Sequence, residues 1–141
     1  MKELYFYVLF AALFAAQTGL IIGGVLEPVF SYSAGNILFS AFIAAVVMYM
    51  GWNLSGSGIR KVAIKGAIAA FVGVTVITCA TILGYTIGKP VLGVSLPSAA
   101  YLFVPILSLL VLNVILYAVL AVLGAWVAQR FKPVQNPPST Q

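Results

Sequence analysis

Residues 55–61 read SGSGIRK, and Lys65 follows four residues later. This is the only internal place in the sequence where cations cluster, and long apolar segments extend from it in both directions. Glycine and serine favour chain reversal, and cations hold a loop on the cytoplasmic side of a bilayer. The stretch therefore predicts the cytoplasmic turn at the centre of a four-helix membrane protein, with Arg60, Lys61 and Lys65 near the lipid headgroups.

The composition of the chain excludes an ordinary soluble domain. Of its 141 residues, 63% are hydrophobic and only 6% are charged, whereas about 25% are charged in a typical globular domain. A soluble fold would need polar surface groups that this chain lacks, so much of its surface must face lipid. The net charge of +5 does not indicate nucleic-acid binding, because the cations lie at the ends of apolar segments rather than on one face.

Four apolar segments are long enough to form membrane-spanning helices. The first has 23 residues, where about 20 suffice, and it is too long for the apolar region of a signal peptide. The expected helices cover residues 4–26, 36–53, 62–87 and 98–131. We expect residues 1–131 to form one transmembrane domain and residues 132–141, which have no apolar face, to be a disordered cytoplasmic tail.

Proline and capping residues indicate the helix ends. Pro28 and Pro90 should end the first and third helices, because the residue before a proline is pushed out of the helical region. Ser98 is the expected N-cap of the fourth helix. Pro105, inside that segment, should bend the helix or mark its true start.

The distribution of cations predicts the topology. With four crossings, six cations fall on one side and Lys89 alone falls on the other. The six are Lys2, Arg60, Lys61, Lys65, Arg130 and Lys132. By the positive-inside rule this side is cytoplasmic. The sequence therefore predicts an all-α integral membrane protein of the cell membrane, built from two antiparallel hairpins with both termini in the cytoplasm.

A faint internal duplication is also visible. The first and third helices are followed by EPV (27–29) and KPV (89–91), and the second and fourth approach their inner ends with GW (51–52) and GAW (124–126). Such a repeat would make two hairpins of the same orientation. Chance similarity between apolar segments is the alternative explanation.

Small residues mark the helix faces on which close packing is expected, because helices in lipid gain more from close approach than from burying leucine. The first helix carries small residues at a strict spacing of four: Ala11, Ala15, Gly19 and Gly23. Gly84 in the third helix and Ala121 and Ala125 in the fourth belong to similar patterns. These residues either pack helices within the chain or, on the first helix, dock a helix from another subunit.

Three polar residues are the candidates for intramembrane contacts: Gln17, Thr78 and Asn113. The second helix offers no such group near its middle. Lipid cannot satisfy an amide, so Gln17 and Asn113 should face other helices, with Asn113 reaching a partner such as Gln17 or Thr78. These polar residues either form hydrogen bonds between helices, each contributing about 0.6–2 kcal/mol, or contact a substrate or quinone.

The sequence lacks the residues that most catalytic and redox sites need. It has no histidine, one cysteine (Cys79) and two acidic residues (Glu3 and Glu27) near helix ends. Histidine-based metal or haem sites and Ser-His-Asp or Cys-His constellations are therefore excluded, and proton-coupled transport usually needs an ionisable group near the membrane centre. We predict neither enzymatic activity nor a cofactor or metal.

The size and helix number resemble those of the small multidrug-resistance transporters. Those proteins carry a glutamate inside the first helix, and the corresponding depth here holds Ala15, Ala16 and Gln17. The resemblance does not extend to that residue, and it assigns no family.

The leading functional hypothesis is a small non-catalytic subunit or assembly factor that packs against larger membrane proteins, of a respiratory, redox or transport complex. The second is a homo-oligomeric channel or transporter for an uncharged solute, with Gln17, Thr78 and Asn113 along the path. The third is a lipid-interacting protein that uses Arg60, Lys61 and Lys65 on anionic headgroups. The expected partners are the bilayer and other membrane subunits or further copies of the chain, without nucleic acid.

Overall fold

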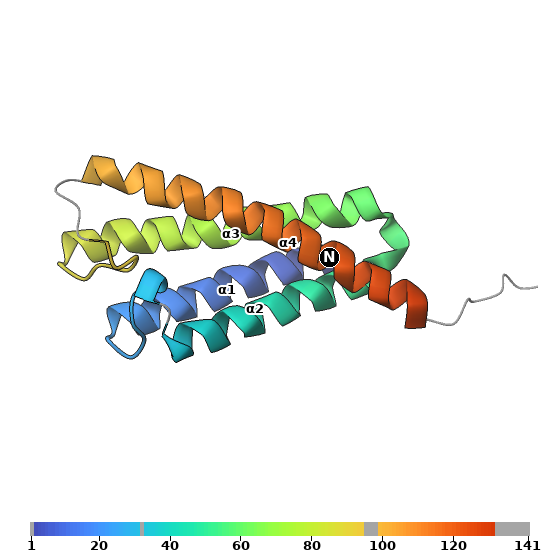
Figure 1. Ribbon diagram of the computed structural model, residues 1–141, viewed down its shortest axis with the longest axis horizontal. Coiled ribbons are helices and arrows are strands. Elements are labelled where there is room, and N and C mark those ends of the chain that lie inside the picture. Colours follow the sequence, from blue (N-terminus) through green and yellow to red (C-terminus); the bar gives the residue numbers. More distant parts are fainter. Residues whose placement is uncertain (1, 32, 95–98, 132–141) are drawn as a thin grey trace, which may run out of the picture.

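The structure, a computed structural model, describes residues 2–31, 33–94 and 99–131. Within these residues every regular element is a helix, and successive helices run in opposite directions (Figure 1). The long helices are α1 (Lys2–Ile22), α2 (Ala34–Asn53), α3 (Ile59–Thr86) and α4 (Phe103–Phe131), and short 3₁₀ helices occupy Val29–Ser31 (η1), Ser55–Ser57 (η2) and Ala99–Leu102 (η3). Each long helix is long and apolar enough to cross a membrane. This confirms the prediction of an all-helical, multi-pass membrane protein.

The helix α1 ends at Ile22, four residues earlier than expected. The cause is Gly24, whose φ of +77° lies in the left-handed region that glycine adopts without strain. The backbone N–H of Val25 donates to the carbonyl of Leu20 at 2.9 Å and closes the final turn. Glycine, rather than Pro28, therefore ends this helix.

Two other helices begin earlier than expected. The helix α3 begins at Ile59, directly after Gly58, which has a φ of +83°. The helix α2 begins at Ala34, because the Ser33 hydroxyl accepts a hydrogen bond from the backbone N–H of Asn36 at 3.4 Å and acts as an N-cap. In both cases a small or polar residue directly before the helix sets the position at which the helix begins.

The helix α4 begins later than expected, at Phe103, and η3 precedes it. Pro105 is therefore the third helical residue, in the first turn, where the missing N–H costs no intrahelical hydrogen bond. It marks the start of the helix, which was one of the two expectations for it. Ser98, the expected N-cap, and the expected tail at residues 132–141 lie outside the described residues.

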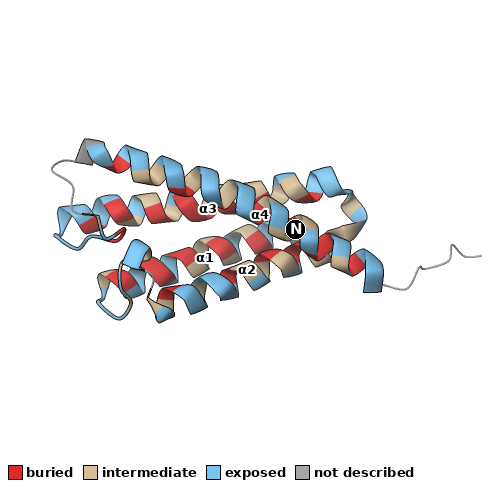
Figure 2. Cartoon of the chain, viewed as in Figure 1, coloured by how far each residue is buried: buried red, intermediate tan, exposed pale blue. Residues whose placement is uncertain are grey.

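The helices α3 and α4 pack against each other, and each packs against one more helix: α3 against α1 and α4 against α2. The consecutive helices α1 and α2 contact each other at few positions. Figure 2 shows buried residues along the facing sides of the helices and exposed residues on their outer sides. On α1 the buried side carries Phe6, Phe10 and Phe14, and a β-carbon at Gly73 of α3 would overlap the Phe14 ring.

The crossing of α2 and α4 depends on two glycines in reciprocal positions. A β-carbon at Gly51 on α2 would collide with the backbone of Ala121 on α4. A β-carbon at Gly124 on α4 would collide with the backbone of Met48 on α2. Because Met48 and Gly51 have the same spacing as Ala121 and Gly124, the two helices present similar surfaces to each other. The close approach brings backbones into direct contact, the arrangement that small residues allow in lipid.

The loop that follows α1 and the loop that follows α3 are joined by backbone hydrogen bonds. Val29 N–H donates to the Val91 carbonyl at 2.9 Å, and Phe30 N–H donates to the Leu92 carbonyl at 3.3 Å. Val91 and Leu92 are buried. The EPV and KPV segments of the faint duplication therefore lie together, although the duplication itself stays a prediction.

Candidate functional site

Gln17 and Asn36 form a polar link between α1 and α2. The Asn36 side-chain nitrogen donates to the carbonyls of Glu27 at 2.8 Å and Pro28 at 2.9 Å. A carbonyl can only accept, so this nitrogen is assigned and Asn36 Oδ1 must be the acceptor for its other partner. That partner is Gln17 Nε2, at 3.5 Å. Gln17 therefore faces another helix, as expected, and both side chains are buried.

Asn36 was missed as a site residue in the sequence, where it was taken only as the first residue of the second helix. Its position at the border of an apolar run is typical of a capping residue, so neither spacing nor composition distinguished it. The available signal was that an asparagine just inside an apolar run must have partners if the helix starts before it. The structure places Asn36 inside α2, where the turn between α1 and α2 supplies those partners.

Asn113 makes its hydrogen bond within α4, rather than with Gln17 or Thr78 as expected. Its side-chain nitrogen donates to the carbonyl of Leu109 at 2.8 Å, one turn earlier. Thr78 behaves in the same way on α3, since its hydroxyl donates to the carbonyl of Val74 at 2.8 Å. Short polar side chains in a helix reach the preceding turn easily, and this local bond competes with bonds to other helices.

Gln17 and Asn113 nevertheless come together at one cavity. It has a volume of about 140 Å³ and is lined by residues from α1, α2, α3, α4 and η1. Its polar lining residues are Gln17, Ser40, Asn113 and Tyr117, and its apolar ones include Phe14, Ile43, Ile77 and Leu109. Thr78 does not line it. The three residues of the expected solute path therefore do not form one path within the chain.

Tyr117 is one of the residues that line this cavity. It is only 5% exposed, and its ring lies 6.4 Å, between centroids, from each of the Phe10 and Phe14 rings. Among the described residues no group hydrogen-bonds to its hydroxyl, and the oxygen is not sealed off from open space. Tyr117 was not among the candidates from the sequence, because a tyrosine in an apolar helix is equally typical of a membrane interface.

The small residues of α1 lie on the outer side of the bundle. Ala15 and Gly19 are exposed, as is Gly23, which lies one residue beyond the end of the helix, and a β-carbon at Gly19 would meet no atom within 4 Å. Ala11 is half-buried. The phenylalanine side of α1, rather than this stripe, faces α3. Packing of the stripe within the chain, one of the two interpretations, is therefore not found at Ala15, Gly19 or Gly23, and docking of a helix from another chain stays a prediction.

The other small residues assigned to packing are buried. Ala121 and Ala125 are both fully buried on α4, and Ala121 contacts α2 and α3 through the space left by Gly51 and Gly66. Gly84 is buried against the loop that follows α3, because a β-carbon there would meet Val91. Its neighbour is thus a loop rather than another helix.

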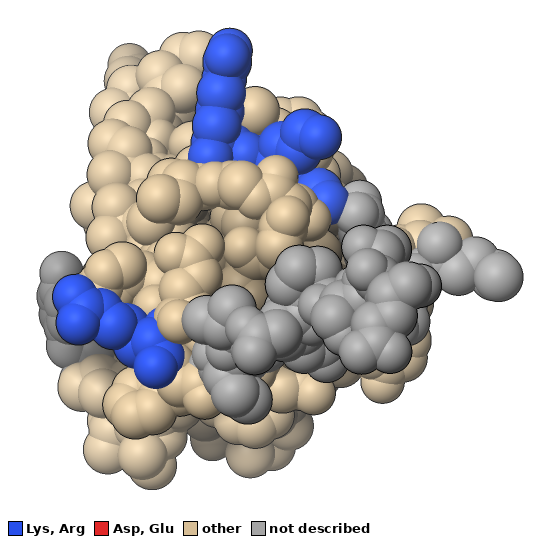
Figure 3. Space-filling view, turned by 90° about the vertical axis from the view of Figure 1, so that its right-hand side faces the viewer, with Lys and Arg blue, Asp and Glu red and all other residues tan. Residues whose placement is uncertain are grey.

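The basic cluster lies in the first two turns of α3 and not in a loop. Arg60 and Lys61 are exposed and Lys65 is half-buried. The guanidinium of Arg130, at the end of α4, lies 5.0 Å from the centroid of the Trp126 ring. Figure 3 shows Lys and Arg side chains gathered at this end, without an acidic side chain among the described atoms in view. This gives the end a positive potential suited to anionic surfaces.

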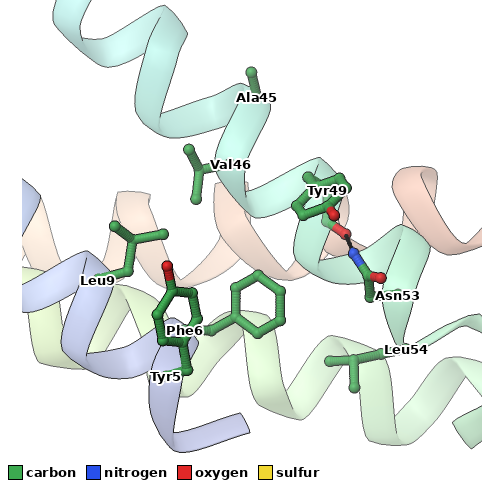
Figure 4. A pocket seen from close by; sticks show the side chains of 8 residues that line it. All are labelled: Tyr5, Phe6, Leu9, Ala45, Val46, Tyr49, Asn53 and Leu54. Atoms are coloured by element: carbon green, nitrogen blue, oxygen red, sulfur yellow. Dashed lines mark hydrogen bonds between the residues drawn. The ribbon is translucent and has the colours of Figure 1, made fainter. Parts of the chain in front are cut away.

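A groove separates the basic-end halves of α1 and α2 (Figure 4). Its volume is about 680 Å³, and its walls are mostly apolar. Tyr5 and Leu9 contribute from α1 and Val46 and Tyr49 from α2. The Asn53 side chain at its end donates to the Tyr49 carbonyl at 2.8 Å. The backbones of α1 and α2 approach each other closely at few positions, and at this groove the helices meet through the rings of Phe6 and Tyr49, whose centroids lie 6.3 Å apart.

The cavity and the groove are lined by apolar side chains together with amides and hydroxyls. Within the described ranges no three metal-ligating side chains lie together. Cys79 is exposed on α3. The cavity presents amides and hydroxyls without a charged side chain, which suits an uncharged molecule because a buried charge without a partner is costly.

Comparisons of the chain with protein-family models, with curated proteins and with solved structures found no match.

Proposed function

We propose that this protein is a small non-catalytic membrane subunit, or an assembly factor, that binds a helix of another membrane protein through the outer side of α1. The observation that carries the proposal is the uncovered small-residue stripe of Ala15, Gly19 and Gly23.

The physical argument rests on how the chain uses its other small residues. On α4, Ala121 and Gly124 already pack closely against another helix of the same chain. On α1 the large side chains Phe10 and Phe14 make the internal contacts, which leaves the small side free. In lipid, a smooth helix side gains van der Waals contacts only when another helix approaches it closely. The open space at Gly19 permits that approach.

The orientation belongs to the same proposal. Arg60, Lys61, Lys65 and Arg130 lie at one end of the bundle, while Lys89 and Glu27 follow α3 and α1 at the other end. Under the positive-inside rule the basic end faces the cytoplasm of the cell, so both termini are cytoplasmic and the chain forms two hairpins. The partner helix would then lie beside α1 within the same membrane.

The test compares two variants of equal size. Gly19→Leu adds a large side chain to the proposed contact, and Ala41→Leu adds one to an exposed position on α2. After gentle extraction and native mass measurement, wild type and Ala41→Leu should retain a heterologous membrane protein that Gly19→Leu loses. Gly19→Leu should unfold at the wild-type temperature or above it, because leucine favours the helix more than glycine does.

Two results would contradict the proposal. Retention of the partner by Gly19→Leu would show that the stripe faces lipid in the assembly. A pure homo-oligomer in the wild type would favour the channel or transporter hypothesis instead.

A further inference from the structure

We propose that the cavity between the four helices binds an uncharged, ring-sized molecule that carries a hydroxyl group, such as a phenol, and that this molecule enters from the lipid. This inference is independent of the docking role of α1. It follows from the hydrogen-bonding groups left open at the cavity, from its volume and from its position.

The two amides of the cavity present oxygens. Asn113 uses its side-chain nitrogen on the Leu109 carbonyl, so its oxygen must point elsewhere. Gln17 uses its nitrogen on Asn36, whose own orientation is set by two backbone carbonyls. Within the described part of the chain neither oxygen receives a hydrogen bond. Because no fully buried side-chain oxygen or nitrogen among the described residues lacks a partner, these two oxygens are accessible, and each can accept a hydrogen bond from a ligand that donates.

The Tyr117 hydroxyl supplies the complementary group. Tyr117 lines the cavity, its side chain is 5% exposed, and no described residue bonds to its hydroxyl. A hydroxyl can donate and accept at once. A ligand hydroxyl can therefore accept from Tyr117 while it donates to Asn113 or Gln17. A carbonyl or ether oxygen can satisfy only the first of these contacts.

The volume selects the size of the ligand. The cavity holds about 140 Å³. One water occupies about 30 Å³ of the liquid, and an apolar protein cavity of about 150 Å³ binds benzene. A six-membered ring thus fits, with Phe14, Ile77 and Leu109 as its apolar surroundings.

The position of the cavity indicates the route of entry. Asn113 lies ten residues after the start of α4, which is about 15 Å along the helix axis. Gln17 lies five residues before the end of α1, and Val29 belongs to η1, so the cavity lies in the half of the bundle toward η1. Two of the lining residues, Ser40 on α2 and Leu116 on α4, are exposed. The cavity therefore opens to the lipid-facing surface between these helices, where a lipid-soluble molecule arrives but an ion does not.

The experiment uses the full chain in lipid nanodiscs with 4-fluorophenol as the probe and fluorine NMR as the readout. The wild type should bind it saturably, and 4-fluoroanisole, which lacks the donor, should bind about tenfold more weakly or not at all. Tyr117→Phe should weaken binding of the phenol about five- to tenfold, since one hydrogen bond is lost. Tyr49→Phe, which removes the same hydroxyl at the α1–α2 groove, should leave it unchanged.

A second variant keeps the test decisive if Tyr117→Phe alters the fold. Asn113→Leu fills part of the cavity and removes an acceptor, so it should also abolish saturable binding while the chain still unfolds cooperatively. Displacement of the probe by 4-octylphenol supports entry from lipid, because the tail can leave between α2 and α4, and its failure to compete overturns that route. Equal binding of 4-fluoroanisole, or unchanged binding in both cavity variants, would overturn the proposal.

Discussion

Replacing Gly51 by alanine tests the close crossing of α2 and α4. The added β-carbon would lie 2.7 Å from the carbonyl carbon of Ala121 and 2.9 Å from its α-carbon, and still closer to its carbonyl oxygen. Ordinary contact between such atoms is about 3.5–4.0 Å. The helices α2 and α4 must therefore separate by roughly 1 Å, since the obstructing atoms belong to the backbone and cannot rotate away.

The cost can be worked out from this displacement. A gap of about 0.5–1 Å forfeits a quarter to a half of the dispersion energy of each contact it opens. Insertion of a methyl group into a packed interior typically destabilises a protein by about 1–3 kcal/mol. We expect Gly51→Ala to lie in the upper part of this range, because the same separation also loosens the contact of Gly124 with Met48.

The matched control is Gly19→Ala, since a β-carbon there meets no atom within 4 Å. It should leave the free energy of unfolding unchanged or raise it by up to about 1 kcal/mol through helix propensity. Unfolding of both variants in bicelles, followed by circular dichroism, measures the difference. If Gly51→Ala is as stable as the wild type, the two helices do not approach as closely as described and the reasoning about the crossing is wrong.

Three further variants test the polar contacts and the orientation. Asn36→Leu should lower the free energy of unfolding by about 2–3 kcal/mol, because it leaves Gln17 and two carbonyls without partners. If the double variant Asn36→Leu/Gln17→Leu loses as much stability as the two single variants added together, the two residues are not coupled. Asn113→Leu should cost about 1 kcal/mol or less in the same assay, because its amide bonds only its own helix, and a loss twice as large would reveal an unrecognised partner. A cysteine at Ser57 should not react with an impermeant maleimide outside intact cells, whereas one at Lys89 should; the reverse pattern would invert the topology.

The sequence by itself determined the class of the protein and the order of its parts. Four apolar runs, each about as long as the hydrocarbon core of a bilayer is thick, predict four spanning helices whatever their packing, because lipid leaves the backbone no other way to satisfy its hydrogen bonds. An apolar run and the residues that end it are close together in the sequence, so both can be recognised without knowledge of the tertiary structure. The expectation that Pro28 ends α1 was wrong, because Gly24 ends it instead. This error moved the end of the helix by four residues but did not affect the prediction that the helix exists.

The candidate site was predictable only in part. That Gln17 would face another helix followed from the cost of an amide in hydrocarbon. Its partner Asn36 and the cavity shared with Asn113 and Tyr117 depend on how α1, α2 and α4 are placed around one another. Spacing along one helix holds no information about which residue of another helix lies at the same depth.

Only the tertiary structure decided which side of each helix faces inward. In water, the contrast between polar and apolar residues reveals the buried side of a helix. Apart from Gln17 and Thr18, the spanning part of α1 is apolar, so this contrast is weak, and both Phe10 and Gly19 were compatible with the interior. The structure buries Phe10 against α3 and leaves Gly19 exposed. The choice depends on the complementary shapes of two helices, as where Gly73 makes room for Phe14, and shape complementarity exists only once the helices are together.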